Sequence, residues 1–240
     1  MDEIEQLQHL IDKAQNIVFF GGAGVSTESG IRDFRSKDGL YQLQSKYGVP
    51  YEAILSHTYY KNNTETFYKF YREFMINTTA KPNPAHSYLA KLENRKRLTV
   101  ITQNIDGLHQ MAGSKNVIEL HGSIHRNHCE SCHEFYSLED ILKMDVVPRC
   151  PHCGGVIKPD VVLYEEGLDY VDINNAISAM EHADLLIIAG TSLAVYPAAN
   201  FINYFPSDNI VVINKVHTPI HRNVALEINK PVGEIFSKLK

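Results

Sequence analysis

The sequence predicts an α/β fold in which helices cover both faces of a parallel β-sheet, with two insertions into the sheet domain. Short runs made only of apolar residues alternate along the chain with segments whose apolar residues recur at helical spacing. That alternation is typical of a parallel sheet buried on both faces. It is broken by an aromatic-rich stretch at residues 35–83 and by a stretch at 123–157 that holds all four cysteines. We therefore expect a sheet domain made of residues 1–34, 84–122 and 158–240, interrupted by two insertions at 35–83 and 123–157.

The predicted elements follow in chain order. Apolar residues at helical spacing predict a first helix over residues 3–15. The apolar run at 16–20 stops at Gly21 and Gly22, which predicts a buried strand followed by a glycine turn. Similar runs predict strands at 98–102, 117–120, 184–189, 209–214 and 224–228. Helical spacing recurs at 84–94 and 171–182, and within the first insertion it is clearest at 66–75.

Net charge and hydropathy argue against several classes of protein. The chain has 240 residues, a formal net charge of −5 and a sequence pI of about 6.2, so it lacks the basic footprint of a nucleic-acid-binding protein. No apolar run approaches the roughly 20 residues of a membrane-spanning helix. The N-terminus lacks the basic and apolar regions of a signal peptide. We expect a cytoplasmic monomer with neither a nucleic-acid nor a membrane partner.

The four cysteines form two C-x-x-C pairs, Cys129/Cys132 and Cys150/Cys153, with seventeen residues between the pairs. Disulfides are rare in a reducing compartment, and a redox motif needs one C-x-x-C at the start of a helix in its own fold. Two such pairs about 15–20 residues apart are the usual spacing of a zinc site. We predict one Zn²⁺ held by four thiolates, with neighbouring histidines as alternative ligands that such a set does not need. Because sulfur fills every ligand position, the metal is expected to be structural.

Polar clusters follow four of the predicted strands, at 21–30, 101–109, 121–122 and 190–193. In open parallel sheets, ligands bind at the edge formed by the carboxyl ends of the strands. The first cluster is a glycine loop before a predicted helix N-terminus, an arrangement that suits a phosphate. It matches neither G-x-G-x-x-G nor a Walker loop, and by itself it is equally well explained as a tight turn. Four clusters at one edge indicate a ligand site.

On these stretches the chain resembles the sirtuins, the NAD-dependent protein deacylases. The matching segments, in family order, are 22–36 (GAGVSTESGIRDFRS), 102–113 (TQNIDGLHQMAG), 119–122 (ELHG), the two C-x-x-C pairs, 158–166, 190–199 and 211–214. The resemblance implies a Rossmann-like large domain, a small domain from a helical and a zinc-binding insertion, and NAD bound in the cleft between them. It also implies a reaction in which the acetyl group of a protein acetyl-lysine passes to ADP-ribose, with release of nicotinamide and O-acetyl-ADP-ribose. Alternatives are removal of other acyl groups, mono-ADP-ribosyl transfer on the same fold, and NAD binding without chemistry.

The resemblance also assigns site residues. His121 matches the general base, a role that an imidazole with a pKa near 6.5 suits at neutral pH, and Asn104 matches the residue that orders the ribose and a water. The residues that match cofactor-binding positions are Gly22, Ala23, Gly24, Thr27, Phe34, Arg35, Gln103, Asn104, Ile105, Asp106, His121, Gly190, Thr191, Ser192, Asn214 and Val232. Those that match substrate-binding positions are Phe34, His121 and Val162, and the backbone of Val162 is expected to pair with the substrate peptide as an added strand.

The acyl preference depends on the helical insertion. Some sirtuins prefer succinyl- or malonyl-lysine and hold the acyl carboxylate with a Tyr-x-x-Arg pair. Here Tyr68 matches the tyrosine, but Tyr71 stands where the arginine would be, and Arg72 points about 100° away on a helix. An acidic acyl group would then bury an unpaired charge, so we expect a neutral group, acetyl first. A further departure is Asp160, where many relatives have Asn.

Overall fold

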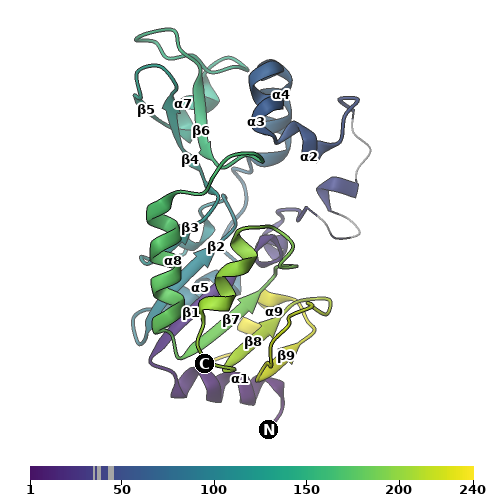
Figure 1. Ribbon diagram of the computed structural model, residues 1–240, viewed down its shortest axis with the longest axis vertical. Coiled ribbons are helices and arrows are strands. Elements are labelled where there is room, and N and C mark those ends of the chain that lie inside the picture. The colour runs from purple at the N-terminus through teal and green to yellow at the C-terminus, as the bar shows by residue number, and fades with distance from the viewer. Residues whose placement is uncertain (35, 37–38, 43–45) are drawn as a thin grey trace.

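The computed structural model describes residues 1–34, 36, 39–42 and 46–240, which form a large lobe and a small lobe joined near the middle of the molecule (Figure 1). The large lobe is built on a six-stranded sheet in the order β3-β2-β1-β7-β8-β9, and every neighbouring pair is parallel. Its strands are β1 (Asn16–Gly21), β2 (Arg97–Thr102), β3 (Val117–Glu119), β7 (Leu185–Ala189), β8 (Ile210–Ile213) and β9 (Leu226–Ile228). The predicted parallel sheet is therefore confirmed, and its strand ends differ from the prediction by one or two residues.

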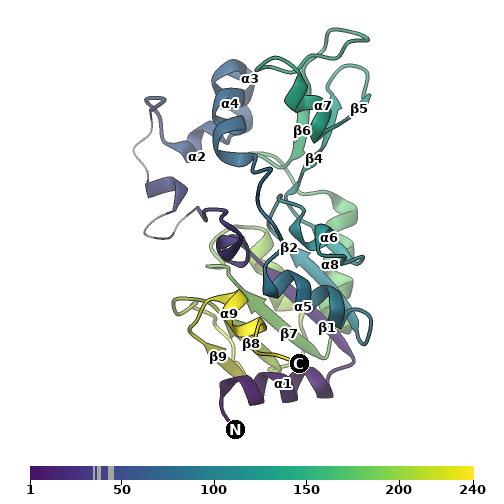
Figure 2. The same cartoon turned by 180° about the vertical axis from the view of Figure 1, so that it is seen from behind.

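Helices cover both faces of this sheet, as predicted. One face packs against α1 (Glu3–Lys13), α5 (Pro84–Leu92) and α9 (Val232–Phe236), and the other against α8 (Tyr170–His182) and the 3₁₀ segment Ala198–Tyr204. Helix α8 lies in front in Figure 1, and α5 lies in front in the reverse view (Figure 2). Successive residues of β1 alternate between the two cores, with Phe19 in one and Phe20 in the other. This double burial is the physical reason that the strands are apolar throughout.

The glycine loop departs from the prediction. No regular helix begins there, because β1 is followed by two single turns of 3₁₀ helix, Ala23–Val25 and Thr27–Ser29. The expectation that a helix begins directly after the glycine loop is therefore wrong. The turns are held from the side by Asn83, the N-cap of α5, whose Nδ2 donates to the Val25 carbonyl at 2.7 Å.

The small lobe combines the two insertions. The first forms short helices, α2 (Tyr51–Ile54), α3 (His57–Asn62) and α4 (Thr64–Phe70), and ends in a π-helical turn, Tyr71–Met75. The second forms an antiparallel sheet in the order β5-β4-β6, made of β4 (Gly122–Cys129), β5 (Phe135–Ser137) and β6 (Ile157–Val161), beside α7 (Leu138–Lys143). The sequence analysis did not predict this sheet. An aromatic core that includes Tyr60, Phe67 and Tyr71 joins the helices to β4 and β6.

Candidate active site

A cavity of about 660 Å³ opens at the carboxyl edge of the large sheet and extends between the lobes. The loops after β1, β2, β3, β7 and β8 line it from the large lobe, and Leu55 and 161–166 are among the residues that line it from the small lobe. Nearly all predicted site residues that the structure describes lie on its wall: Ala23, Gly24, Thr27, Phe34, Gln103, Asn104, Ile105, Asp106, His121, Val162, Gly190, Thr191, Ser192, Asn214 and Val232. Gly22 does not line it, and Arg35 lies outside the described residues.

The cavity begins where the order of strands in the sheet reverses. The chain runs outward from β1 through β2 to β3, and later from β7 through β8 to β9, so the loops after β1 and β7 flank a topological switch point. There the two loops touch through their backbones: Gly24 N donates to Gly190 O at 2.8 Å, and a Cβ on Gly24 would lie 2.7 Å from Gly190 Cα. Gly22 serves the same packing, since a Cβ there would lie 2.7 Å from Thr191 Cβ. These glycines shape the wall of the cavity by letting its two loops approach.

His121 lies on the cavity wall between β3 and β4. Its ring Nδ1 is 3.0 Å from the Gln103 carbonyl oxygen, which can only accept, so Nδ1 carries the proton and Nε2 carries the lone pair. Burial lowers the pKa of His121, and the Gln103 carbonyl offsets this in part. The imidazole is therefore neutral at pH 7 and presents a basic nitrogen.

Ser26 joins two of the predicted residues and was not predicted itself. It is 1% exposed, its Oγ donates to Asp106 Oδ2 at 2.7 Å, and it accepts from Asn104 Nδ2 at 3.0 Å. Burial raises the pKa of Asp106, and hydrogen bonds from Ser26 and from the Leu108 N–H oppose that rise. The sequence motif contains several hydroxyl residues around Ser26, and only the 3₁₀ geometry of the loop shows which of them points toward Asp106.

Amides, hydroxyls and cations also line the cavity. Asn214, one residue beyond β8, donates through Nδ2 to the Thr191 carbonyl at 3.0 Å and to Thr218 Oγ1 at 2.8 Å. Gln103 Nε2 donates to Thr191 Oγ1 at 3.3 Å. Lys215 and Arg32 also line the cavity, and the sequence analysis had selected neither.

The wall toward the small lobe is apolar around Phe34, Ile105, Ile124 and Leu163. Val162 lies one residue beyond β6, and its N–H already donates to the His121 carbonyl at 3.0 Å. A peptide strand beside it would therefore pair with the Val162 carbonyl oxygen.

The Tyr-x-x-Arg positions lie away from this wall. Tyr68 is buried in the aromatic core, where its hydroxyl donates to the Ile157 carbonyl. Tyr71 is also buried, and its hydroxyl has no hydrogen-bond partner among the described residues. Arg72 points to the end of α7 and donates to backbone carbonyls there, including that of Asp145 at 2.7 Å. Among the described residues these three positions offer no cation to the cavity.

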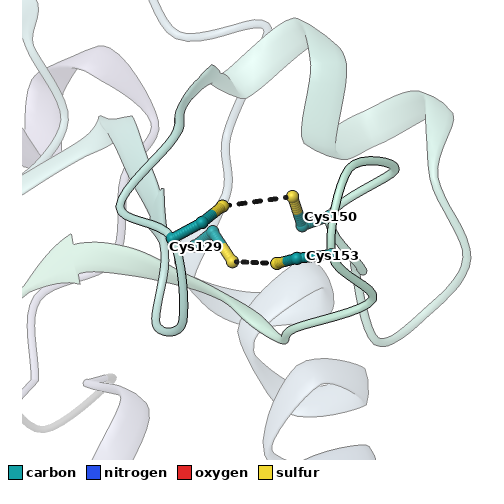
Figure 3. A group of neighbouring side chains, drawn as sticks. Cys129, Cys150 and Cys153 are labelled. Carbon is teal, nitrogen blue, oxygen red and sulfur yellow. Dashed lines mark hydrogen bonds between the residues drawn. The ribbon is translucent and has the colours of Figure 1, made fainter.

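The four cysteines lie together in the small lobe, and none of them lines the cavity. Figure 3 shows Cys129, Cys150 and Cys153 converging from two facing turns. The sulfur of Cys129 is 3.4 Å from that of Cys153, the sulfur of Cys132 is 3.6 Å from that of Cys150, and all four lie within 4.8 Å of one another. No disulfide joins them. A tetrahedron with Zn–S bonds of about 2.3 Å has edges of about 3.8 Å, so the four sulfurs are spaced to hold one zinc ion.

Comparison with known proteins decides the family. A model of the Sir2 family matches residues 22–197. The chain belongs to the Sir2 family. The NAD-dependent protein deacetylase of Clostridium acetobutylicum is 52% identical to this Sir2 chain over 238 residues, which are 98% of this chain and 97% of the relative. The protein of the same name from Clostridium tetani is 55% identical over 238 residues, 98% of this chain and 96% of the relative. A solved structure of Sir2 with a deacetylated peptide and 3′-O-acetyl ADP ribose matches with a TM-score of 0.89 at 36% identity, covering 98% of this chain and 96% of that one.

The residues present in this Sir2 chain fit a dinucleotide. The cavity volume lies within the usual range for small-molecule sites. Cationic Lys215 and Arg32 suit a pyrophosphate, and the Asn104, Asp106 and Asn214 side chains suit ribose and carboxamide groups. No helix within the described residues is long and apolar enough to cross a membrane.

Proposed function

We propose that this Sir2 protein is an NAD-dependent protein lysine deacetylase. One observation carries the proposal: a neutral histidine with a free basic nitrogen, an amide–hydroxyl–carboxylate group and a peptide-pairing segment all line one cavity. The names of the two clostridial relatives and the peptide and acetyl ADP ribose in the solved Sir2 structure support it. When bound, NAD supplies the ADP-ribose that accepts the acetyl group, and nicotinamide leaves.

Different residues of the cavity wall have different roles in the reaction. His121 acts as the general base through Nε2, because Nδ1 donates to the Gln103 carbonyl and fixes the tautomer. Asn104 and Asp106 orient the nicotinamide ribose and carboxamide, and Ser26 holds both side chains in place. The donor and acceptor positions on the cavity wall support these assignments, which the resemblance to the sirtuins suggested.

The remaining predicted residues bind the rest of NAD and the substrate. The loops after β1, β7 and β8, together with Val232 at the start of α9, take the phosphates and the adenosine through Ala23, Gly24, Thr27, Gly190, Thr191, Ser192, Asn214 and Val232. Phe34 shields the reacting carbon from water. The carbonyl of Val162 pairs with the backbone of an acetylated protein segment, so recognition asks little of the substrate sequence.

The cysteine tetrad holds a structural Zn²⁺, and we keep the predicted domain boundaries, the monomeric state and the cytoplasmic location as part of the proposal. A hydrogen bond from the Tyr136 hydroxyl, 3.1 Å from the Cys150 sulfur, lowers the pKa of Cys150 to about 6, which favours the thiolate that binds zinc. Acetyl is the preferred acyl group, because the positions of the Tyr-x-x-Arg pair supply no cation to the cavity.

The deciding experiment follows an acetyl-lysine peptide by mass spectrometry with and without NAD, beside a succinyl-lysine peptide. We expect NAD-dependent loss of acetyl with formation of O-acetyl-ADP-ribose, inactive His121→Ala, and full activity in His182→Ala, whose ring lies at the exposed end of α8. Faster loss of succinyl would contradict the acyl assignment. Consumption of NAD with ADP-ribose on protein and no loss of acyl would show a transferase instead.

A further inference from the structure

Strand β4 contains a bulge at the junction of the two lobes. Ser123 pairs with Asp160 of β6 and Asn127 pairs with Pro159, so the three residues between them, 124–126, have no partner on β6. Bulges of this kind bend a strand and re-aim its side chains, and they are over-represented beside active sites. We call residues 124–126 the β4 bulge.

Two residues of the β4 bulge, Ile124 and His125, bond to residues of the cavity wall. Ile124 N donates to the Ile105 carbonyl at 3.1 Å, and its side chain lines the cavity. His125 Nε2 lies 3.1 Å from the Asp106 carbonyl oxygen, which accepts. The bulge therefore binds the small lobe to the loop after β2 through two hydrogen bonds.

Arg126, the third residue of the bulge, links the two sheets through ion pairs. Its Nη1 donates to Glu119 Oε2 at 2.6 Å, and its Nε donates to Asp160 Oδ2 at 2.9 Å. Glu119 ends β3 in the large sheet, and Asp160 lies in β6 of the small sheet (Figure 1). The Glu119 side chain is only 8% exposed, so Arg126 is the cation that compensates a buried carboxylate. Asp172 at the start of α8 adds further negative charge, and burial raises its pKa.

The two acidic partners of Arg126 bracket His121. Glu119 precedes it by two residues, and Asp160 precedes by two residues the Val162 N–H that donates to the His121 carbonyl. Between them Gly122 has φ +74°, and a Cβ there would lie 1.8 Å from the Asp160 carbonyl oxygen, so β4 and β6 are in direct backbone contact at this point. A shift of β6 relative to β3 would therefore move both His121 and Val162.

We propose that the β4 bulge connects the two lobes at the cleft, and that Arg126 is a positioning residue. Through Glu119 and Asp160, Arg126 holds His121 and the peptide-pairing segment at Val162 in register. This inference rests on the proposed deacetylase function. Arg126 does not line the cavity. It also gives the departure at Asp160 a reason, since the side chain at that position faces Arg126 and not the cavity.

The test compares peptide and NAD parameters in Arg126→Met, Arg126→Lys and Arg222→Met. Arg222 is the matched control, because it also joins chain segments through carbonyls, those of Ile202 and Phe205, and it lies outside the cavity wall. In Arg126→Met we expect kcat/KM for the acetyl peptide to fall by about 10- to 100-fold, the effect of a small misplacement of reacting groups. The Kd of NAD, by calorimetry, should change by less than about twofold, because its loops belong to the large lobe.

The lysine variant keeps the inference testable if Arg126→Met does not fold. Lysine preserves the charge opposite Glu119 but cannot donate to both carboxylates in the same fork geometry, so an intermediate loss in peptide kcat/KM is expected. Wild-type peptide kinetics in Arg126→Lys, an equal loss in Arg222→Met, or a parallel loss of NAD affinity would each overturn the inference. Absence of deacetylation in the wild-type protein would instead refute the proposed function.

Discussion

Removing the Ser26 hydroxyl tests how the site is organised. Ser26→Ala deletes the donor to Asp106 at 2.7 Å and the acceptor from Asn104 at 3.0 Å, and it leaves both groups in a site where Ser26 is 1% exposed. A hydrogen bond to a charged group contributes about 1.5–3 kcal/mol. Since 1.4 kcal/mol corresponds to a factor of ten, kcat/KM for NAD should fall by about 10- to 150-fold.

The mutation also changes the charge state of the site. The Ser26 hydrogen bond opposes the rise that burial causes in the pKa of Asp106, so its loss raises that pKa further. We expect the variant to lose activity on the acidic side at a higher pH than the wild type. The assay is nicotinamide release against NAD concentration at saturating acetyl peptide, repeated across pH, with urea unfolding as a check of the fold.

Ser29→Ala is the matched control. Ser29 lies in the same pair of 3₁₀ turns and accepts a hydrogen bond from Asn83 Nδ2 at 3.1 Å, but it does not bond to Asn104 or Asp106. Its removal should cost stability without the loss in kcat/KM for NAD. A folded Ser26→Ala protein with wild-type NAD kinetics, or equal losses in the two variants, would refute the reasoning.

Three further predictions concern pH and metal. Burial lowers the pKa of His121 in the free protein, so the acidic limb of the kcat/KM profile should lie below pH 6.5, and a limb above that value would contradict its role as a neutral base. Burial also lowers the pKa of His86 to about 4 and of His109 to about 3, so both take up protons on unfolding below pH 6.5. Urea titrations should show the free energy of unfolding falling by about 1.4 kcal/mol per pH unit for each histidine as pH drops from 6.5 toward 4. The fall should be less steep in His109→Leu, and equal slopes in the variant and the wild type would refute the assignment. Chelation should release one zinc per chain to a metal-sensitive dye and abolish deacetylation. Cys150→Ser should likewise lack both the bound zinc and the activity. Recovery of deacetylation with dithiothreitol alone would indicate a disulfide instead.

Much of the site could be predicted because its chemistry is local in sequence. The residues after β1, β2, β3 and β7 come from contiguous motifs, and parallel strands bring their carboxyl ends to one edge without further information. The zinc ligands were predictable for the same reason: C-x-x-C spacing places two sulfurs on one turn, and two turns complete a tetrahedron.

Contacts between distant segments were not predictable in this way. The role of Gly22 in packing against Thr191 depends on β1 and β7 being neighbours in the sheet. The inward direction of Ser26 depends on two 3₁₀ turns that replace the expected helix. The burial of Tyr68 depends on the Ile157 carbonyl, which lies in a strand 89 residues away.

The parallel sheet, the two insertions, the cysteine tetrad and most residues of the cavity wall were predictable from local sequence, because burial on both faces and ligand spacing impose patterns on a few consecutive residues. The antiparallel sheet of the small lobe, the bulge in β4 and the pairing of Arg126 with Glu119 and Asp160 became visible only in the folded chain. The ion pairs of Arg126 join residues that are 7 and 34 positions apart in the chain and lie in two different sheets. The energy of these pairs depends on the burial of Glu119, which no local pattern of residues encodes.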